Sequence, residues 1–183
     1  MNKQLDFQEI RTNAAERIEN IQHNRMNIAL LCDRMTDAKN VGAMFRIADA
    51  ARLEKIYFFQ STVDFTHKKL TKVARSTNKY VDFEKINDFK KIQEIVKEYE
   101  VIALDKTSES INYTDLQLKS NKKILLIIGA ERFGVSPELL NIASTTIHLP
   151  MLGVNTSMNV SVATGIAVYY LCSFSSLYGQ KTT

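Results

Sequence analysis

The run Ile-Leu-Leu-Ile-Ile at residues 124–128 is apolar at every position. A strand with one face in water alternates apolar and polar residues, and a surface helix repeats apolar residues every three or four positions. A short run with neither period is typical of a strand that is covered on both faces, as the strands of parallel sheets are. The run therefore favours an α/β fold.

Further short apolar runs alternate with segments of helical spacing along the rest of the chain. The predicted strands are residues 27–32, 55–59, 80–83, 101–104, 124–128 and 146–149, and the predicted helices between them are residues 41–51, 66–75 and 88–99. This alternation predicts a mainly parallel sheet flanked by helices.

Helices are also predicted near both ends of the chain and after the 124–128 strand. Residues 6–22 have apolar side chains at spacings of three and four. Ser136 followed by Pro137 indicates a helix start, and this short helix is expected to end at about residue 143. Residues 159–177 predict a long, largely apolar helix. We expect an N-terminal helical extension (1–24), one globular domain (25–178) and a tail (179–183).

Composition indicates the general class of protein but not which reaction, if any, it catalyses. The 183 residues, 45% of them hydrophobic, suffice for one domain with a substantial core, and the net charge of +4 is compatible with a polyanionic partner. Cys32 and Cys172 lie in apolar runs without metal-ligand spacing, which predicts buried thiols. Without a signal peptide or a membrane-spanning run, the chain is expected to be soluble and cytoplasmic, with no membrane partner.

The first segment with chemical potential follows the first predicted strand. Residues 40–48 read Asn-Val-Gly-Ala-Met-Phe-Arg-Ile-Ala, at a strand-to-helix transition where open α/β sheets hold ligands. Gly42 permits close approach of another chain or a ligand, and the guanidinium of Arg46 can bind a phosphate through two N–H groups. An alternative is a capped helix that carries a surface arginine.

The second segment, Gly-Ala-Glu-Arg-Phe-Gly at residues 129–134, directly follows the buried 124–128 strand. Its two glycines allow the backbone to lie against a ligand, and Glu131 is expected at the carboxyl end of the strand. The segment matches neither the GxGxxG dinucleotide fingerprint nor a P-loop, so cofactors of those two kinds are disfavoured. An alternative is that Glu131 only caps the next helix.

The third segment combines the end of a strand with a polar helix start. Ile147 to Met151 read Ile-His-Leu-Pro-Met, and residues 157–161 read Ser-Met-Asn-Val-Ser before the apolar terminal helix. Ser157, Asn159 and Ser161 exceed what one N-cap requires, which favours a ligand near the helix start. The alternative assigns Ser157 as the cap and Asn159 as a solvated first-turn residue.

Together the three segments resemble the SpoU-type, or TrmH-like, family of RNA ribose methyltransferases, part of the trefoil-knotted methyltransferase superfamily. The family pattern is Asn-x-Gly-x-x-x-Arg, then Gly-x-Glu-x-x-Gly, then Pro-Met with Ser-Leu-Asn-x-Ser. This chain matches each in that order, with Met158 where Leu is usual. That exchange nearly conserves volume. The resemblance spans about residues 27–170.

The resemblance implies a deep trefoil knot in the last third of the chain. It also implies transfer of a methyl group from S-adenosylmethionine to a ribose 2′-hydroxyl of tRNA or rRNA, with no metal. Three loops, around residue 104, residues 129–131 and residues 147–158, would hold the cofactor. The cofactor-binding residues carried over are Leu104, Gly129, Glu131, Ile147, Leu149, Met151, Ser157 and Met158. The catalytic residues carried over are Arg46, Asn40, Glu131, Ser157 and Asn159.

Among these residues, Arg46 needs a role that fits its chemistry. Members of the family often have this arginine assigned to activating the 2′-hydroxyl, yet a guanidinium is a poor base at neutral pH because its pKa exceeds about 12. We therefore expect Arg46 to anchor an RNA phosphate or to stabilise the developing alkoxide.

The expected RNA surface is a basic stripe formed by Lys68, Lys72, Arg75 and Lys79. Their spacings of four, three and four would align them on one helical face, opposite Leu70 and Val73. Taken without the motifs, such a run is more often a solvated face.

The apolar terminal helix suits burial in a subunit interface, and family members usually dimerise, so a homodimer is expected. Two further hypotheses stay open at this point. One is a non-catalytic RNA-binding protein with the same fold. The other is an unrelated α/β protein whose terminal helix forms an oligomer interface.

Overall fold

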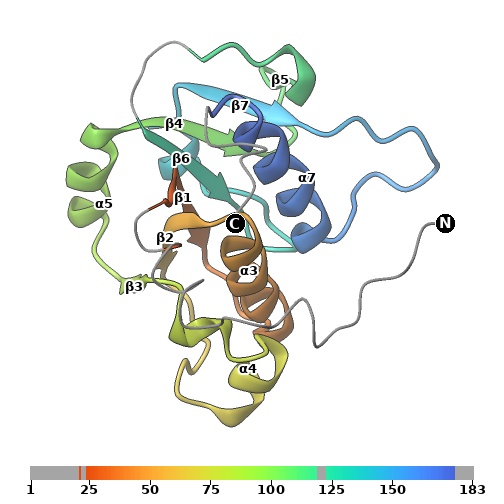
Figure 1. Ribbon diagram of the computed structural model, residues 1–183. Helices are drawn as coiled ribbons and strands as arrows, with labels where there is room; N and C mark the ends of the chain where they lie inside the picture. Colours follow the sequence, from red (N-terminus) through yellow and green to blue (C-terminus); the bar gives the residue numbers. More distant parts are fainter. Residues whose placement is uncertain (1–20, 22–23, 119–122, 176–183) are drawn as a thin grey trace, which may run out of the picture.

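The structure, a computed structural model, describes residues 21, 24–118 and 123–175. Its centre is a sheet in which every paired strand is parallel (Figure 1). The strands are β1 (Met26–Asp33), β2 (Leu53–Phe59), β3 (Phe83–Ile86), β4 (Tyr99–Leu104), β5 (Ile111–Asn112), β6 (Lys123–Ile128) and β7 (Thr145–His148). Their order in the sheet is β3-β2-β1-β6-β4-β7-β5.

Helices cover both faces of this sheet and form two separate cores. One face carries α3 (Ala38–Ala50), α4 (Lys68–Val73) and α7 (Val160–Cys172), and the other carries α5 (Phe89–Ile95) and α6 (Pro137–Leu140). In Figure 1, α3 and α7 lie side by side, as their contacts also show. The 3-10 helices η1, η2 and η3 span Thr77–Lys79, Val96–Glu98 and Tyr113–Asp115.

The central strands are buried because they are apolar on both faces. In β1, Leu30 and Cys32 pack in the core beneath α3 and α7, whereas Ala29 and Leu31 pack in the opposite core. Residues 124–128 of β6 are likewise buried throughout. The predicted α/β class, with a mainly parallel sheet flanked by helices, is therefore confirmed.

Several element boundaries differ from the predictions. The predicted strand at residues 80–83 is wrong for most of its length, because β3 pairs with β2 from Phe83 to Ile86 and Tyr80 is exposed. The predicted 88–99 helix is shorter, because α5 ends at Ile95 and is followed by η2. Tyr99 is the first residue of β4. The helix after Ser136 ends at Leu140, short of residue 143. Strand β5 was not predicted, because two residues are too few to show a period.

The basic stripe was predicted on one continuous helix, and this is wrong. Helix α4 contains only residues 68–73, and Arg75 and Ser76 have φ angles of 50° and 66°, which take the chain out of the helix. Lys79 consequently lies in η1. The turn brings the buried Ala74 back to the core, so packing of the connection overrides the helical spacing.

Other expectations concern residues or chain paths that the structure does not describe. The predicted helix at residues 6–22 and the tail lie outside the described residues, apart from Ile21. The terminal helix reaches Cys172 within the described range, short of the predicted residue 177. The trefoil knot stays a prediction. Among the described helices, none is long and apolar enough to cross a membrane.

Both cysteines are free thiols buried in the core, as predicted. Burial raises the pKa of the Cys172 thiol to about 11, partly opposed by the positive charge of Arg52. Burial, reinforced by the carboxylate of Asp33, raises the pKa of Cys32 further above its usual value. Neither thiol therefore has appreciable thiolate character at neutral pH.

Candidate active site

The carboxyl ends of β6, β4 and β7 border a cavity of about 560 Å³. These three strands are neighbours in the sheet, in the order β6-β4-β7. Open α/β sheets bind ligands at the carboxyl ends of their strands. The lining residues are Leu104, Asp105, Lys106, Ile128, Gly129, Ala130, Glu131, Arg132, Gly134, His148, Leu149, Met151, Thr156, Ser157, Met158, Asn159, Val160 and Ala163.

Polar side chains from the three sequence motifs meet at this cavity. Asn40, at the start of α3, donates from Nδ2 to Oε1 of Glu131 at 2.5 Å. Its Oδ1 accepts from Nδ2 of Asn159 at 3.4 Å. Asn40 is only 7% exposed, whereas Glu131 and Asn159 line the cavity. The carboxamide of Asn40 thus bonds to Glu131, 91 residues away in the sequence, and to Asn159, 119 residues away.

Asn159 also shapes the start of α7. Its Oδ1 accepts from the backbone N–H of Ser161 at 2.8 Å and from the Ser161 hydroxyl at 2.5 Å. Asn159 is therefore the N-cap, and the alternative in which Ser157 caps the helix is wrong. Ser157 precedes the cap and lines the cavity instead.

The glycines of the second motif close a tight hairpin. Ala130 and Gly134 form an antiparallel bridge, with N–H to O distances of 3.1 and 2.9 Å. A Cβ on Gly129 would lie 2.0 Å from the carbonyl carbon of Gly134, and Gly134 itself has a φ of 64°. The glycines are thus needed for close approach within the hairpin, and both also line the cavity, where the predicted backbone contact with a ligand stays a prediction.

Gly42 in the first motif also allows a close approach, one of the two possibilities expected for it. A Cβ at this position would lie 2.6 Å from Cγ1 of Val73. The neighbour that Gly42 admits is therefore helix α4, and not a ligand.

Three predicted site residues, Arg46, Ile147 and Asn40, do not line the cavity. Arg46 is exposed on α3, six residues beyond Asn40, which corresponds to about 9 Å along the helix axis. Ile147 is fully buried in the core, and its carbonyl accepts from the N–H of Asp105 at 3.0 Å. Asn40 contacts the lining through Glu131, and the other carried-over residues lie on it.

The basic residues lie apart from this cavity. Lys68, Lys72 and Arg75 line a separate hollow of about 600 Å³, together with Thr66, Thr71 and Ser76. Lys79 does not line it. The turn at Arg75 and Ser76 therefore gathers three cations around one hollow, in place of the predicted stripe.

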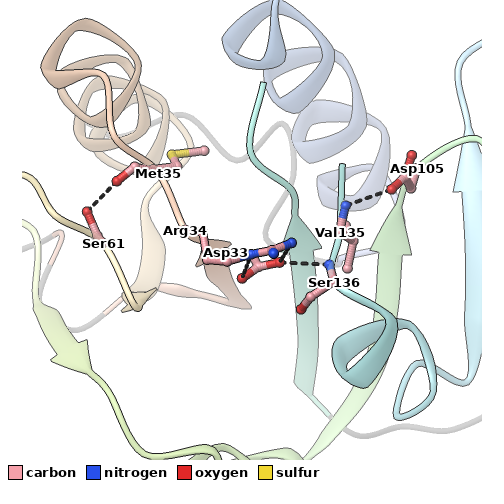
Figure 2. Close-up of polar contacts among 7 residues, drawn as sticks. All are labelled: Asp33, Arg34, Met35, Ser61, Asp105, Val135 and Ser136. Atoms are coloured by element: carbon pink, nitrogen blue, oxygen red, sulfur yellow. Dashed lines mark hydrogen bonds and ion pairs between the residues drawn. The ribbon is translucent and has the colours of Figure 1, made fainter. Parts of the chain in front are cut away.

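Three polar residues at the carboxyl ends of the strands were not predicted as site residues. Asp33 and Asp105 directly follow apolar positions of β1 and β4, and each accepts a backbone N–H from the segment after the hairpin (Figure 2). His148 lines the cavity, with Nδ1 at 3.0 Å from the hydroxyl of Ser110. Their position after buried strands was the available signal.

Comparison with known proteins assigns a family. The profile described as the SpoU rRNA Methylase family matches residues 27–169. A tRNA (guanosine(18)-2′-O)-methyltransferase of Aquifex aeolicus is 29% identical over 154 residues, which are 82% of this chain and 71% of that protein. The chain spans only 56% to 58% of several related 23S rRNA (guanosine-2′-O-)-methyltransferases.

Solved structures agree with this assignment. An A. aeolicus TrmH/SpoU tRNA modifying enzyme superimposes with a TM-score of 0.74 and 27% identity, covering 87% of this chain and 82% of that one. An AdoMet-bound rRNA methyltransferase from Sinorhizobium meliloti gives a TM-score of 0.73 and 25% identity, covering 80% and 56% of the two chains. With the family profile matched across all three motifs, this chain belongs to the SpoU rRNA methylase family.

Proposed function

We propose that this chain transfers a methyl group from S-adenosylmethionine to a ribose 2′-hydroxyl of tRNA or rRNA. The observation that carries the proposal is the bonded series Glu131–Asn40–Asn159, which joins the three motifs at one cavity. The related proteins named as tRNA and 23S rRNA 2′-O-methyltransferases support the reaction and the RNA class.

The cavity fits S-adenosylmethionine in size and chemistry. Its volume lies within the range of small-molecule sites, and its lining combines apolar side chains with polar groups. Leu104, Leu149 and Met158 offer apolar contacts, while Gly129 and Ala130 present backbone at the end of β6. When bound, the cofactor supplies an electrophilic methyl group. An AdoMet-bound neighbour in the same fold supports this choice of cofactor.

The chain's own residues divide the remaining work. Asn40 holds Glu131 at the cavity, and Asn159 holds Asn40 from the other side. Glu131, Ser157 and Asn159 face the space where a ribose hydroxyl must approach the cofactor. Correct placement of the two reactants contributes several kcal/mol, on the order of what oriented groups supply in other enzymes.

Arg46 binds an RNA phosphate in this proposal. Its guanidinium is exposed on the helix that begins at Asn40, outside the cavity lining. An exposed guanidinium can bind a phosphate through two N–H groups, whereas it cannot take a proton at neutral pH. Arg46 therefore positions the backbone beside the reacting ribose.

Lys68, Lys72 and Arg75 provide a second phosphate site. Their three cations surround one hollow next to α4, with the hydroxyl residues Thr66, Thr71 and Ser76 beside them. Clustered cations bind polyanions with an affinity that falls steeply with salt. Lys79, outside the hollow, adds positive charge on the adjacent η1 turn.

The chain acts as a homodimer in the cytoplasm, with α7 in the subunit interface. Val162, Ile166 and Tyr169 are exposed apolar residues at spacings of four and three, so they share one face of α7. The opposite face, including Ala167, Val168 and Leu171, is buried in the core. A second copy would remove the exposed apolar face from water.

The first experiment is calorimetric titration of S-adenosylmethionine into the purified protein. Tritiated-methyl transfer to bulk RNA comes next, for the wild type, Arg46→Ala and the matched control Lys90→Ala, whose exposed cation lies on α5 at the opposite face of the sheet. We expect cofactor binding by all three proteins and loss of transfer only in Arg46→Ala. Absence of both binding and transfer in the wild type would favour the non-catalytic RNA-binding hypothesis. A map of modified nucleotides in cells lacking the protein then identifies the target.

A further inference from the structure

The hairpin that carries Glu131 has an exposed tip on a short base. Its bridge joins Ala130 to Gly134, and Glu131, Arg132 and Phe133 project beyond it, with Phe133 78% exposed. A bridge between two residues supplies little rigidity by itself. The segment after Gly134 must therefore fix the direction of the hairpin.

Strand register places a carboxylate on each side of the hairpin base. Cys32 of β1 and Leu104 of β4 are both paired with Ile128 of β6. The next residues, Asp33 and Asp105, consequently flank Gly129, roughly 9 to 10 Å apart at two strand spacings.

Both side chains also project from the same face of the sheet. Ala29 and Leu31 precede Asp33 at intervals of two, and Val101 and Ala103 precede Asp105 in the same way. These apolar residues all belong to the core that contains Val135 and Leu139. Because side chains alternate between the two faces along a strand, both carboxylates point toward the segment that follows the hairpin.

The two carboxylates accept two consecutive amides of that segment (Figure 2). The N–H of Val135 donates to Oδ2 of Asp105 at 2.7 Å, and the N–H of Ser136 donates to Oδ2 of Asp33 at 2.7 Å. Asp33 is fully buried and forms an ion pair with Arg34 at 3.1 Å. The Arg34 guanidinium donates to both of its oxygens, which fixes the plane of the carboxylate.

Two neighbouring residues, Ser136 and Gly134, are consistent with these bonds. The hydroxyl of Ser136 is buried without a hydrogen-bond partner among the described residues, so the predicted serine cap is not used. A Cβ on Gly134 would lie 2.4 Å from Oδ2 of Asp105. The absence of a side chain at Gly134 thus lets the carboxylate reach the next amide.

We propose that Asp33 and Asp105 are positioning residues that hold the Glu131 hairpin against Asn40. Two charge-assisted bonds anchor the return segment, the Ala130–Gly134 bridge transmits that anchor, and Glu131 reaches Asn40 at the cavity. Asp33 does not line the cavity, so its effect is exerted through the hairpin. The consequence for methyl transfer rests on the function proposed above.

The first test is residue-resolved amide hydrogen exchange by NMR, which requires no activity. In Asp105→Ala the amide of Val135, and in Asp33→Ala the amide of Ser136, should exchange about tenfold faster or more, because each N–H loses its charged acceptor. The bridge amides of Ala130 and Gly134 should also exchange faster in both variants, because the hairpin loses an anchor. Asp105→Asn and Asp33→Asn, which keep one carbonyl acceptor, should restore much of the protection. If Asp33→Ala does not fold, Asp105→Ala and the two Asn variants decide the outcome.

The matched control is Asp88→Ala. Asp88 also accepts a backbone N–H, from Lys90 at 2.9 Å, but it caps α5 away from the hairpin. Its loss should leave the exchange of the hairpin amides unchanged. Full protection in Asp105→Ala, or equal loss of protection in Asp88→Ala, would overturn the proposal.

The second test asks whether the two aspartates act through Glu131. Asp105→Ala should lower kcat for methyl transfer about tenfold while the far-UV spectrum stays that of the wild type. Adding Asp105→Ala or Asp33→Asn to Glu131→Ala should cause no further loss, because residues that act through one group are not additive. Independent, multiplying losses would contradict the proposal. If the wild type transfers no methyl group, the proposed function fails, and hydrogen exchange still decides whether the carboxylates hold the hairpin.

Discussion

At the scale of the residue, Asn40 has the chemistry that joins the three motifs. A carboxamide has both a donor and an acceptor, and Asn40 uses the donor for Glu131 and the acceptor for Asn159. Neither a carboxylate nor an aliphatic side chain of the same size offers both. The near-complete burial of Asn40 makes each unmet bond costly.

Asn40→Asp should therefore make the protein sensitive to pH. A carboxylate there would lie against that of Glu131, so the pair would hold a proton and one pKa would rise above its unfolded value. Because the folded-state pKa is raised, stability relative to the wild type should fall as the pH rises through that pKa. Thermal unfolding midpoints measured from pH 5 to pH 8.5 would show this trend.

Methyl transfer by Asn40→Asp should drop about tenfold or more at pH 8. Asn87→Asp is the control, since Asn87 is exposed between β3 and α5. A midpoint difference from the wild type that does not vary with pH would argue against the contact between positions 40 and 131.

At the scale of the element, the residue that caps α7 also bonds to Asn40 beside the cavity. Asn159 accepts from Ser161 as an N-cap and donates to Asn40 through its other side-chain atom. The capping bond and the bond to Asn40 consequently depend on different atoms of one residue, which substitution can separate.

Asn159→Asp keeps the capping acceptor and loses the donor to Asn40. We expect its free energy of unfolding to fall by about 1 kcal/mol, the cost of the unmet Asn40 acceptor, without a further loss from the cap, because aspartate is an equally good cap, while methyl transfer falls. Asn159→Ala should lose about 1 kcal/mol of stability in addition. Denaturant titration and transfer assays on both variants would check this, and equal stability losses would show that the capping bond to Ser161 contributes nothing to folding.

The hairpin is the second element whose geometry leads to a prediction. Gly129→Ala would place a Cβ 2.0 Å from the Gly134 carbonyl carbon and 2.2 Å from the Val135 nitrogen, both backbone atoms. Because the backbone cannot move aside without breaking the hairpin, we expect a loss of roughly 3 kcal/mol or more in unfolding free energy. Gly153→Ala, where a Cβ meets nothing within 4 Å, should change it by less than about 0.5 kcal/mol. Similar values for the two variants in denaturant titration would refute the tight-hairpin geometry.

At the scale of the whole molecule, the described residues leave one apolar face of α7 uncovered, with Val162, Ile166 and Tyr169 exposed on it. Helix α7 packs against α3, β1 and β6 with its other face. A standard interface buries about 800 Å² on each partner, which one helix face and its surroundings can supply.

Ile166→Lys should convert the proposed dimer to a monomer, because it would bury a charge in an apolar interface. Sedimentation velocity at micromolar concentration measures this directly. Ile111→Lys, on β5 at the edge of the sheet, is the matched control, since Ile111 is 38% exposed and Ile166 is 40% exposed. A wild-type monomer, or a dimer that survives Ile166→Lys, would remove α7 from the interface.

Much of this molecule was predictable from its sequence, because burial on both faces leaves a local pattern. The apolar runs at residues 27–32 and 124–128 indicated a parallel sheet, and the three motifs indicated the family and the edge of the sheet that carries the cavity. Glu131 and Asn159, which the motifs singled out, both line the cavity.

Tertiary structure alone decided which residues meet, because those contacts depend on register and on packing between segments far apart in sequence. It joined Asn40 to both Glu131 and Asn159, and it made Asn159 the cap of α7. It ended α4 early, because the connection had to return to the core. Asp33 and Asp105 gained their roles only when β1 and β4 came to flank β6, an arrangement that no local pattern of apolar residues records.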